Sequence, residues 1–145
     1  MDDDYRWFDL PTRLLMAALF LQSGIGKLLD RADTEAYMRA FDLPSFLLWP
    51  AAVWELIASV LLALGLGTRW VALLLSGWCL LTAVIFHTDF TDQLMQIMFF
   101  KNMVMAGGFI AVARSGAPGL SIDSWLTQRR SVNAREDRRM TAGRW

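Results

Sequence analysis

The chain has 145 residues, of which 55% are hydrophobic and 19% are charged, and its 14 Lys and Arg residues balance 14 Asp and Glu residues. This balance excludes nucleic-acid binding through a strongly basic surface, and the composition excludes a disordered or collagen-like chain. Cys79 is the single cysteine, so a disulfide scaffold is excluded as well. Between residues 43 and 86 the only charged residues are Glu55 and Arg69, and this segregation of charge predicts a membrane protein.

Four apolar segments are predicted to form membrane-spanning helices, because a hydrocarbon core of about 30 Å needs about 20 helical residues. The first runs over 14–25 and reaches spanning length only with 26–29, where Lys27 can extend its amine toward the headgroups. The others run over 46–66, 70–86 and 94–113. A cleaved signal peptide is a less favoured alternative for the first segment, since its leading flank is acidic and no small-residue cleavage site follows.

The segments between and after the spans complete the predicted organisation. Tyr37, Met38 and Phe41 form an apolar stripe at helical spacing, which predicts a short interfacial helix over 34–41. Residues 114–119 break the last span. The segment over 126–145 contains six arginines and two acidic residues, Glu136 and Asp137. We therefore predict an all-α integral membrane four-helix bundle with a short outer interfacial helix. Its divisions are an N-terminus over 1–12, a transmembrane domain over 13–123 and a flexible Arg-rich tail over 124–145.

The loop charges predict the orientation of the bundle in a plasma or inner membrane. Lys and Arg residues are enriched in cytoplasmic loops. One side of the predicted membrane carries Arg31 and Arg39, whereas the opposite side carries a larger group: Arg6, Arg13, Arg69, Arg114, Arg129, Arg130 and the later arginines of the tail. Both termini are therefore predicted to be cytoplasmic.

Three ionisable residues interrupt the predicted spans, namely Lys27, Glu55 and Lys101. Each costs about 2.5–3.5 kcal/mol near the centre of a membrane helix, so they should meet one another or water. At 1.5 Å per residue, Glu55 and Lys101 lie about 14 Å below the outer boundary and Lys27 lies about 9 Å below it. His87 ends the third span on the same side. This shared depth predicts a polar pocket near the outer surface.

Glu55 and Lys101 are the candidate residues for a proton or ligand site. Four further residues with polar or ionisable side chains join Lys27 as candidate ligand-binding groups, because they neighbour these positions: Gln22, Ser23, His87 and Asn102. Structural alternatives stay open for the four ionisable groups. Glu55 and Lys101 could form an ion pair that only fixes helix register, Lys27 could simply extend to the headgroups, and His87 could be an interfacial histidine. No metal-binding motif, phosphate-binding loop or catalytic triad pattern occurs, so no metal site is predicted.

At these positions the sequence resembles the DoxX family of small bacterial and archaeal membrane proteins. The likeness extends over residues 13–123 in a series of short motifs: Arg13, Phe20-x-x-Ser23-Gly24-x-x-Lys27, Thr34-x-x-Tyr37, Leu43-Pro44, Glu55, Leu64-Gly65-x-Gly67-Thr68-Arg69, His87, Lys101-Asn102-x-x-x-Ala106-Gly107-Gly108 and Gly119-Leu120-Ser121-Ile122-Asp123. The resemblance implies a four-helix protein of the inner membrane. Some relatives look like subunits of a thiosulfate:quinone oxidoreductase, and others are linked to redox, thiol or quinone stress.

Two functional hypotheses follow. In the first, the protein is a redox-linked membrane subunit or accessory that holds a quinone-like or small anionic ligand in the outer pocket; quinone is the one cofactor considered. In the second, it is a non-enzymatic membrane anchor or assembly subunit whose tail contacts a soluble redox enzyme. A transporter is less favoured, because four spans show no inverted repeat. Membrane lipid is an expected partner, and close helix approach at Gly24, Gly26, Gly107 and Gly108 permits self-association without requiring it.

Overall fold

The computed structural model describes residues 6–142, apart from the side chains of 136–139 and 141–142. Predictions for residues 1–5 and 143–145 lie outside this range. The described chain is helical and contains no strand, in this order: α1 (Arg6–Leu29), α2 (Arg31–Ala40), a 3-10 turn η1 (Ser45–Leu47), α3 (Leu48–Leu64), α4 (Thr68–Phe86), α5 (Gln93–Ser115) and α6 (Ile122–Ala142). The prediction of an all-α membrane bundle is confirmed, and α1 begins within the segment expected to precede the domain.

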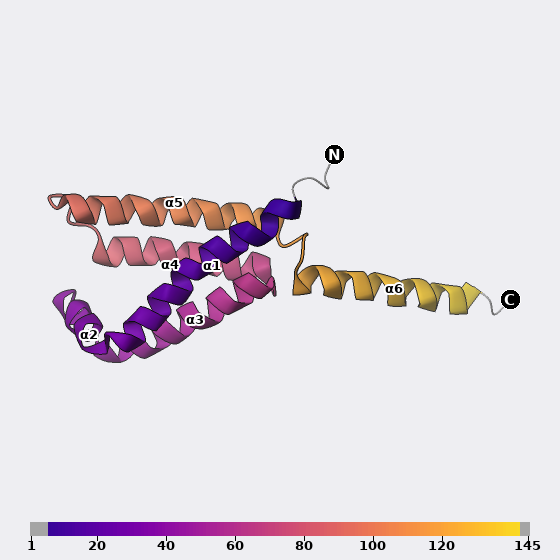
Figure 1. Cartoon of the computed structure of the whole chain (residues 1–145), viewed down its shortest axis with the longest axis horizontal. Helices are drawn as coiled ribbons and strands as arrows, with labels where there is room; N and C mark the ends of the chain where they lie inside the picture. Colours follow the sequence, from indigo (N-terminus) through magenta and orange to yellow (C-terminus); the bar gives the residue numbers. More distant parts are fainter. Residues whose placement is uncertain (1–5, 143–145) are drawn as a thin grey trace.

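Two antiparallel helix pairs build the bundle: α1 packs along α3, and α4 packs along α5. The pairs meet near the start of α6 and separate toward the opposite end, where α2 lies (Figure 1). We call these the α6 end and the α2 end. The beginnings of α1 and α6 lie at the same end of the bundle, but the side of the membrane to which this end belongs stays a prediction.

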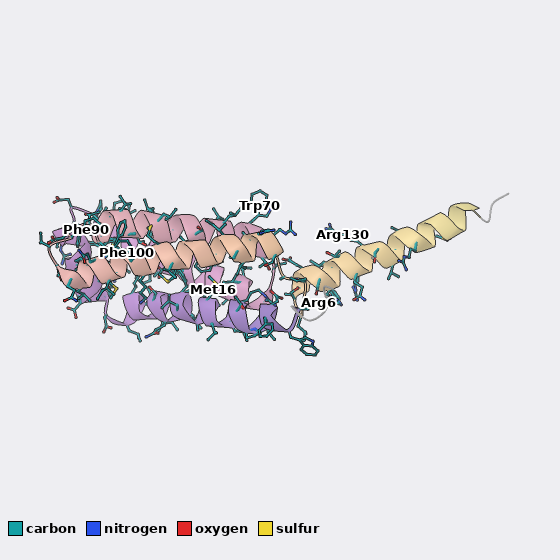
Figure 2. The ribbon with its side chains drawn as sticks, turned by 90° about the horizontal axis from the view of Figure 1, so that it is seen from above. Arg6, Met16, Trp70, Phe90, Phe100 and Arg130 are labelled. Atoms are coloured by element: carbon teal, nitrogen blue, oxygen red, sulfur yellow. The ribbon has the colours of Figure 1, made fainter. Side chains whose placement is uncertain are left out.

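Three stretches, Ser45–Leu64, Thr68–Phe86 and Gln93–Ser115, are long and apolar enough to cross a membrane. Many of their apolar side chains point away from the bundle, including Trp70 and Phe100 (Figure 2), as expected for surfaces that contact lipid. α1 has 24 residues and is long enough as well, about 36 Å at 1.5 Å per residue. It is less apolar because it carries Arg13 and Lys27, both of which bond to other helices.

The tightly packed core lies where the two pairs meet. The rings of Phe20 on α1 and Phe109 on α5 contact edge to face, with centroids 5.5 Å apart, and join one pair to the other. Within the first pair, a Cβ at Gly24 would lie 2.9 Å from Leu56 Cγ, so the predicted close helix approach occurs there. A Cβ at Gly26 or Gly107 would meet nothing within 4 Å, so no close approach occurs at those two glycines.

Arg13 fastens the α6 end. Its guanidinium is fully buried. It donates to the α3 carbonyls of Leu62 (3.2 Å) and Ala63 (2.9 Å), to the Leu120 carbonyl (2.7 Å), and to both carboxylate oxygens of Asp9 (3.2 Å each). The terminal carbonyls of a helix have no partner within that helix. Arg13 therefore ties α1 both to the end of α3 and to the segment before α6.

Asp123 closes the same end from the other side. Its carboxylate accepts hydrogen bonds from the backbone N–H groups of Gly67 (2.8 Å) and Thr68 (2.9 Å), which begin α4. Although burial acts to raise the pKa of Asp123, these bonds and the nearby Arg13 lower it overall. Gly65 accepts from the Asp123 N–H (2.9 Å) and has a φ of 66°, a left-handed conformation that favours glycine. The motifs around residues 13, 65–68 and 119–123 thus form one hydrogen-bonded structure.

The tail differs from its prediction in secondary structure. The sequence lacks apolar periodicity after residue 126 and predicts a flexible tail, but residues 122–142 form α6, which extends away from the bundle (Figure 1). Its start is fixed by the hydrogen bond from Ser124 N–H to Ser121 Oγ (3.1 Å). Gln, Arg, Ala, Glu and Met residues favour helix without an apolar face. Intrinsic propensity, which the periodicity argument ignores, accounts for the difference.

Candidate functional site

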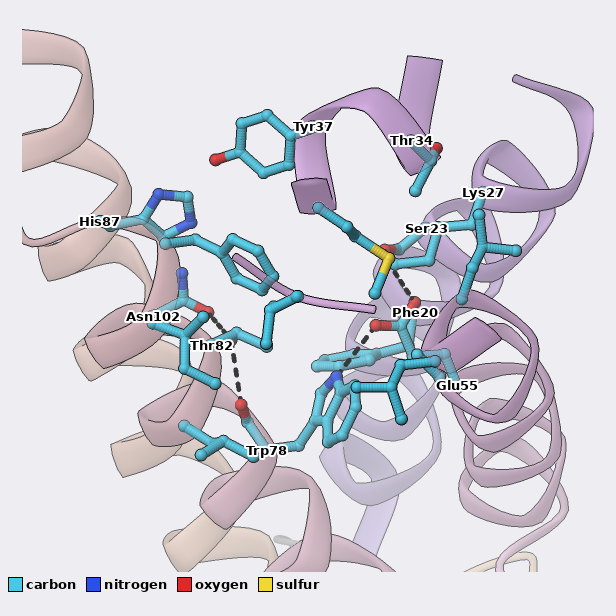
Figure 3. Close-up of a pocket in the computed structure, with 18 of the residues that line it drawn as sticks. Phe20, Ser23, Lys27, Thr34, Tyr37, Glu55, Trp78, Thr82, His87 and Asn102 are labelled. Atoms are coloured by element: carbon cyan, nitrogen blue, oxygen red, sulfur yellow. Dashed lines mark hydrogen bonds and ion pairs between the residues drawn. The ribbon is translucent and has the colours of Figure 1, made fainter. Parts of the chain in front are cut away.

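A cavity of about 550 Å³ occupies the space between the helix pairs at the α2 end. Its volume falls within the range of about 300–1,000 Å³ that is typical of small-molecule sites. Apolar side chains from α1 to α5 make most of its wall. A smaller set of polar side chains lines the rest, as Figure 3 shows: Ser23, Lys27, Thr34, Tyr37, Glu55, Trp78, Thr82, His87 and Asn102. Lys101 lines the cavity as well.

The Glu55 cluster, formed by Ser23, Lys27, Glu55 and Trp78, occupies one wall. Glu55 is buried in α3, and its Oε2 accepts a hydrogen bond from Lys27 Nζ at 2.7 Å. Its Oε1 accepts from Trp78 Nε1 at 2.9 Å, and Lys27 also donates to Ser23 Oγ at 2.6 Å. The Glu55 cluster therefore joins α1, α3 and α4, and the charges of Lys27 and Glu55 cancel within it. The Lys27 ammonium has three N–H donors, and these contacts use two of them.

The opposite wall carries His87, Asn102 and Thr82, which we call the Asn102 wall (Figure 3). Asn102 Nδ2 donates to the Met98 carbonyl at 2.9 Å, while Thr82 Oγ1 lies 3.4 Å from Asn102 Oδ1. These contacts orient the amide from within α5 and from α4. They leave hydrogen-bonding capacity at Asn102 for a group inside the cavity.

His87 follows the last residue of α4 and contributes an uncharged imidazole to the Asn102 wall. Burial lowers the pKa of His87 below its ordinary value, against a smaller opposing effect of the Phe86 backbone. The ring is therefore neutral at neutral pH, with one donor and one acceptor nitrogen. Its Nδ1 is buried and has no hydrogen-bond partner within the described chain.

The short helix α2 covers the cavity at the α2 end. Tyr37 stacks on Phe86 of α4 with ring centroids 5.5 Å apart, and Phe41 contacts both rings at 5.0 Å and 5.2 Å. This aromatic group connects α2 to the second helix pair, where the pairs are otherwise apart. The short helix expected over 34–41 is present as Arg31–Ala40, and its position at the membrane interface stays a prediction.

Six of the seven candidate site residues line this one cavity: Ser23, Lys27, Glu55, His87, Lys101 and Asn102. Gln22 does not, because it is exposed on α1, about 100° around the helix from Ser23. The possible ion pair between Glu55 and Lys101 is also wrong: the carboxylate bonds to Lys27, and Lys101 is exposed with no ion-pair partner among the described residues. Lys101 is kept apart because α5 belongs to the second helix pair.

Trp78 and Tyr37 are site residues that the sequence analysis did not assign. A tryptophan inside an apolar span carries an N–H group that needs a partner, and this was the available indication for Trp78. Tyr37 was recognised as part of an apolar stripe, but the element that the stripe covers could not be read from its spacing. Within the part of the chain that the structure describes, no group of three or more His, Cys, Asp or Glu residues is placed to hold a metal ion.

Comparisons with known proteins agree with the membrane assignment. A family model described as DoxX matches residues 8–88. The chain is 37% identical over 120 residues to "Inner membrane protein YqjF" of Escherichia coli (strain K12), which covers 83% of this chain and 92% of that protein. It is 33% identical over 121 residues to "Inner membrane protein YphA" of the same organism, over 79% of this chain and 86% of that protein. No solved structure matches the chain significantly.

Proposed function

Because this chain belongs to the DoxX family of inner membrane proteins, we propose that it serves membrane redox chemistry by holding a quinone-like ligand in the cavity at the α2 end. In this proposal the α2 end faces the outside of the cell and both termini lie in the cytoplasm. The observation that carries the proposal is an apolar cavity with polar groups on two opposite walls.

The placement of polar groups on two opposite walls favours a quinone-like ring over a small anion. A quinone has an apolar body with oxygens at opposite ends, and one oxygen can face the Glu55 cluster while the other faces the Asn102 wall. A small anion would leave water for a mostly apolar cavity, which is costly without close charge pairing. Lys27 is already neutralised by Glu55 at 2.7 Å, so it offers a remaining N–H donor rather than a free charge.

The residues of the cavity would bind the ligand, orient it and hold protons near its oxygens. A bound quinone–quinol couple would supply chemistry that exchanges electrons and protons together. Lys27 can donate its third N–H to one oxygen, and Glu55 can accept a proton beside it. On the other wall, Asn102 and the neutral His87 can hydrogen-bond the second oxygen, with His87 placed nearest the end of α4.

Quinone binding is expected to be saturable and to depend on the Asn102 wall. We predict that Asn102→Leu weakens the binding of decylubiquinone to the purified protein in nanodiscs by roughly fivefold, the effect of about one hydrogen bond. The matched control is Gln22→Leu, which changes a polar residue on the outside of α1 and should leave affinity unchanged. Quenching of tryptophan fluorescence measures both, since Trp78 lines the cavity. Equal affinity in the wild type and Asn102→Leu, or no saturable binding, would contradict the proposal.

A second candidate function is an anchor or assembly subunit for a soluble redox partner. The observation that favours it is α6, which projects from the bundle (Figure 1) and exposes Arg129, Arg130 and Arg135. In this case, removal of residues 126–145 is expected to abolish co-purification of a redox enzyme while quinone binding is unaffected. A partner that is retained by the truncated chain would argue against this role of α6.

A further inference from the structure

On the side of the cavity between α1 and α5, the two helices are in contact only toward the α6 end. Met16 on α1 lies against α5, because a Cβ at Gly108 would be 3.2 Å from Met16 Cε. One turn further along α1, Phe20 contacts Phe109. Beyond these contacts the two helices diverge toward the α2 end (Figure 1).

Lys101 lies within this opening. Positions 101, 105 and 108 fall on one stripe of α5, since residues three and four apart share a helix face, and at 108 that stripe meets α1. Two turns further toward the α2 end, Lys101 lines the cavity and is nevertheless exposed. Tyr37, Pro50 and Leu81 also line the cavity and are exposed, but Lys101 is the one charged residue of these four.

The surface around Lys101 is apolar, as expected of a surface that contacts lipid. Its neighbours Ile97, Phe100 and Val104 are exposed by 55%, 60% and 76%, on a helix apolar enough to span the membrane. Lys101 lies eight residues after the start of α5, about 12 Å along the helix. No hydrogen-bond or ion-pair partner for its amine exists among the described residues. An unpaired cation at this depth is unfavourable unless a polar group meets it.

From this arrangement we infer that the cavity opens sideways into the membrane between α1 and α5, and that its ligand is a membrane-dissolved amphiphile with a tail. The oxygen-bearing head lies in the cavity with one oxygen bonded by Lys101, and the apolar tail passes through the opening into the surrounding lipid. This inference rests on the proposed function and narrows it to quinones that carry a long apolar chain. The aromatic contacts of Tyr37 and Phe41 with Phe86, which hold α2 over the α2 end, favour the sideways route over the aqueous one.

A photoreactive probe can locate the tail directly. The probe is a benzoquinone whose alkyl tail ends in a diazirine, added to the full-length protein in nanodiscs and mapped by mass spectrometry. We expect labels on α1 and α5 beside the opening, near Leu19 and Val104, that excess decylubiquinone removes. Competable labels on α2 would overturn the inference, and so would labels at Pro50 and Leu81, the exposed lining residues of α3 and α4. The absence of competable labels anywhere would instead overturn the proposed function and this inference with it.

Lys101 also has a charge-specific role that a substitution can measure. Lys101→Met is expected to weaken decylubiquinone binding at least about tenfold, since it removes a charge-assisted hydrogen bond to one ligand oxygen. Arg114→Met, which removes another exposed cation from α5 near the α6 end, is the matched control and should leave affinity unchanged. If Lys101→Met binds as tightly as the wild type while Asn102→Leu is weakened, the quinone site stands and the role given to Lys101 is wrong.

Discussion

Replacing Lys27 by methionine is expected to destabilise the protein by about 3–5 kcal/mol, because it leaves a buried carboxylate without its cationic partner. The Glu55 side chain is only 4% exposed, and without Lys27 its remaining hydrogen-bond partner among the described residues is the Trp78 N–H. Equilibrium unfolding in mixed micelles with a rising fraction of dodecyl sulfate, followed by circular dichroism, measures the loss.

The reverse substitution is expected to cost less. In Glu55→Gln the lysine keeps an oxygen acceptor, and its side chain, 26% exposed, can extend toward the headgroups. The double variant Lys27→Met/Glu55→Gln removes both charges and should recover much of the stability, because removal of both partners leaves no stranded charge. Lys101→Met, which has no ion pair to break, is the control and should change unfolding little. Equal losses for Lys27→Met and Lys101→Met would show that the ion pair does not contribute.

Arg13→Met is expected to destabilise the α6 end by a similar amount, about 3–5 kcal/mol. The substitution removes the Arg13 hydrogen bonds to the carbonyls of Ala63 and Leu120, one of the two donors to the Leu62 carbonyl, and the cation paired with Asp9. Because these groups belong to α1, α3 and the segment before α6, their mutual positions should loosen together. Arg13 is fully buried, so water cannot simply replace the lost contacts.

The matched control for Arg13 is the exposed Arg114, for which Arg114→Met should lie within about 0.5 kcal/mol of the wild type. Thermal unfolding in detergent ranks the two variants, and limited proteolysis around residues 116–121 tests whether that segment is released. Wild-type unfolding together with unchanged proteolysis in Arg13→Met would contradict the fastening role of this residue.

Much of the fold follows from local sequence. The length of the apolar segments predicted α3, α4 and α5, and every predicted boundary lies within two residues of the observed one. The spacing of Tyr37 and Phe41 predicted α2. The helical tail was missed because α6 is stabilised by intrinsic propensity and by its fixed start at Ser121 rather than by an apolar face. The bonds of Arg13 join positions up to 107 residues apart, so no local pattern could have predicted them.

For the candidate site, counting depth along the helices was informative but incomplete. It predicted that Lys27 and Glu55 could meet, since ions in hydrocarbon need partners whichever helix they come from. Depth did not distinguish Lys101 from these two residues, because it does not give the lateral distance between helices. α1 and α5 diverge toward the α2 end (Figure 1), so Lys101 lies apart at a similar depth. Assignment of Gln22 failed for a related reason: neighbours in sequence point about 100° apart on a helix, and only the position of α3 decides which one faces inward.

The most direct test of the account asks whether the Glu55 cluster binds a ligand or only holds the helices together. The measurement is the affinity of decylubiquinone for the folded Lys27→Met/Glu55→Gln double variant in nanodiscs, compared with the wild type at matched stability. The account predicts binding at least about tenfold weaker, since the N–H donor and the proton acceptor beside one ligand oxygen are both lost. Wild-type affinity in a stably folded double variant would show that the cluster is structural alone.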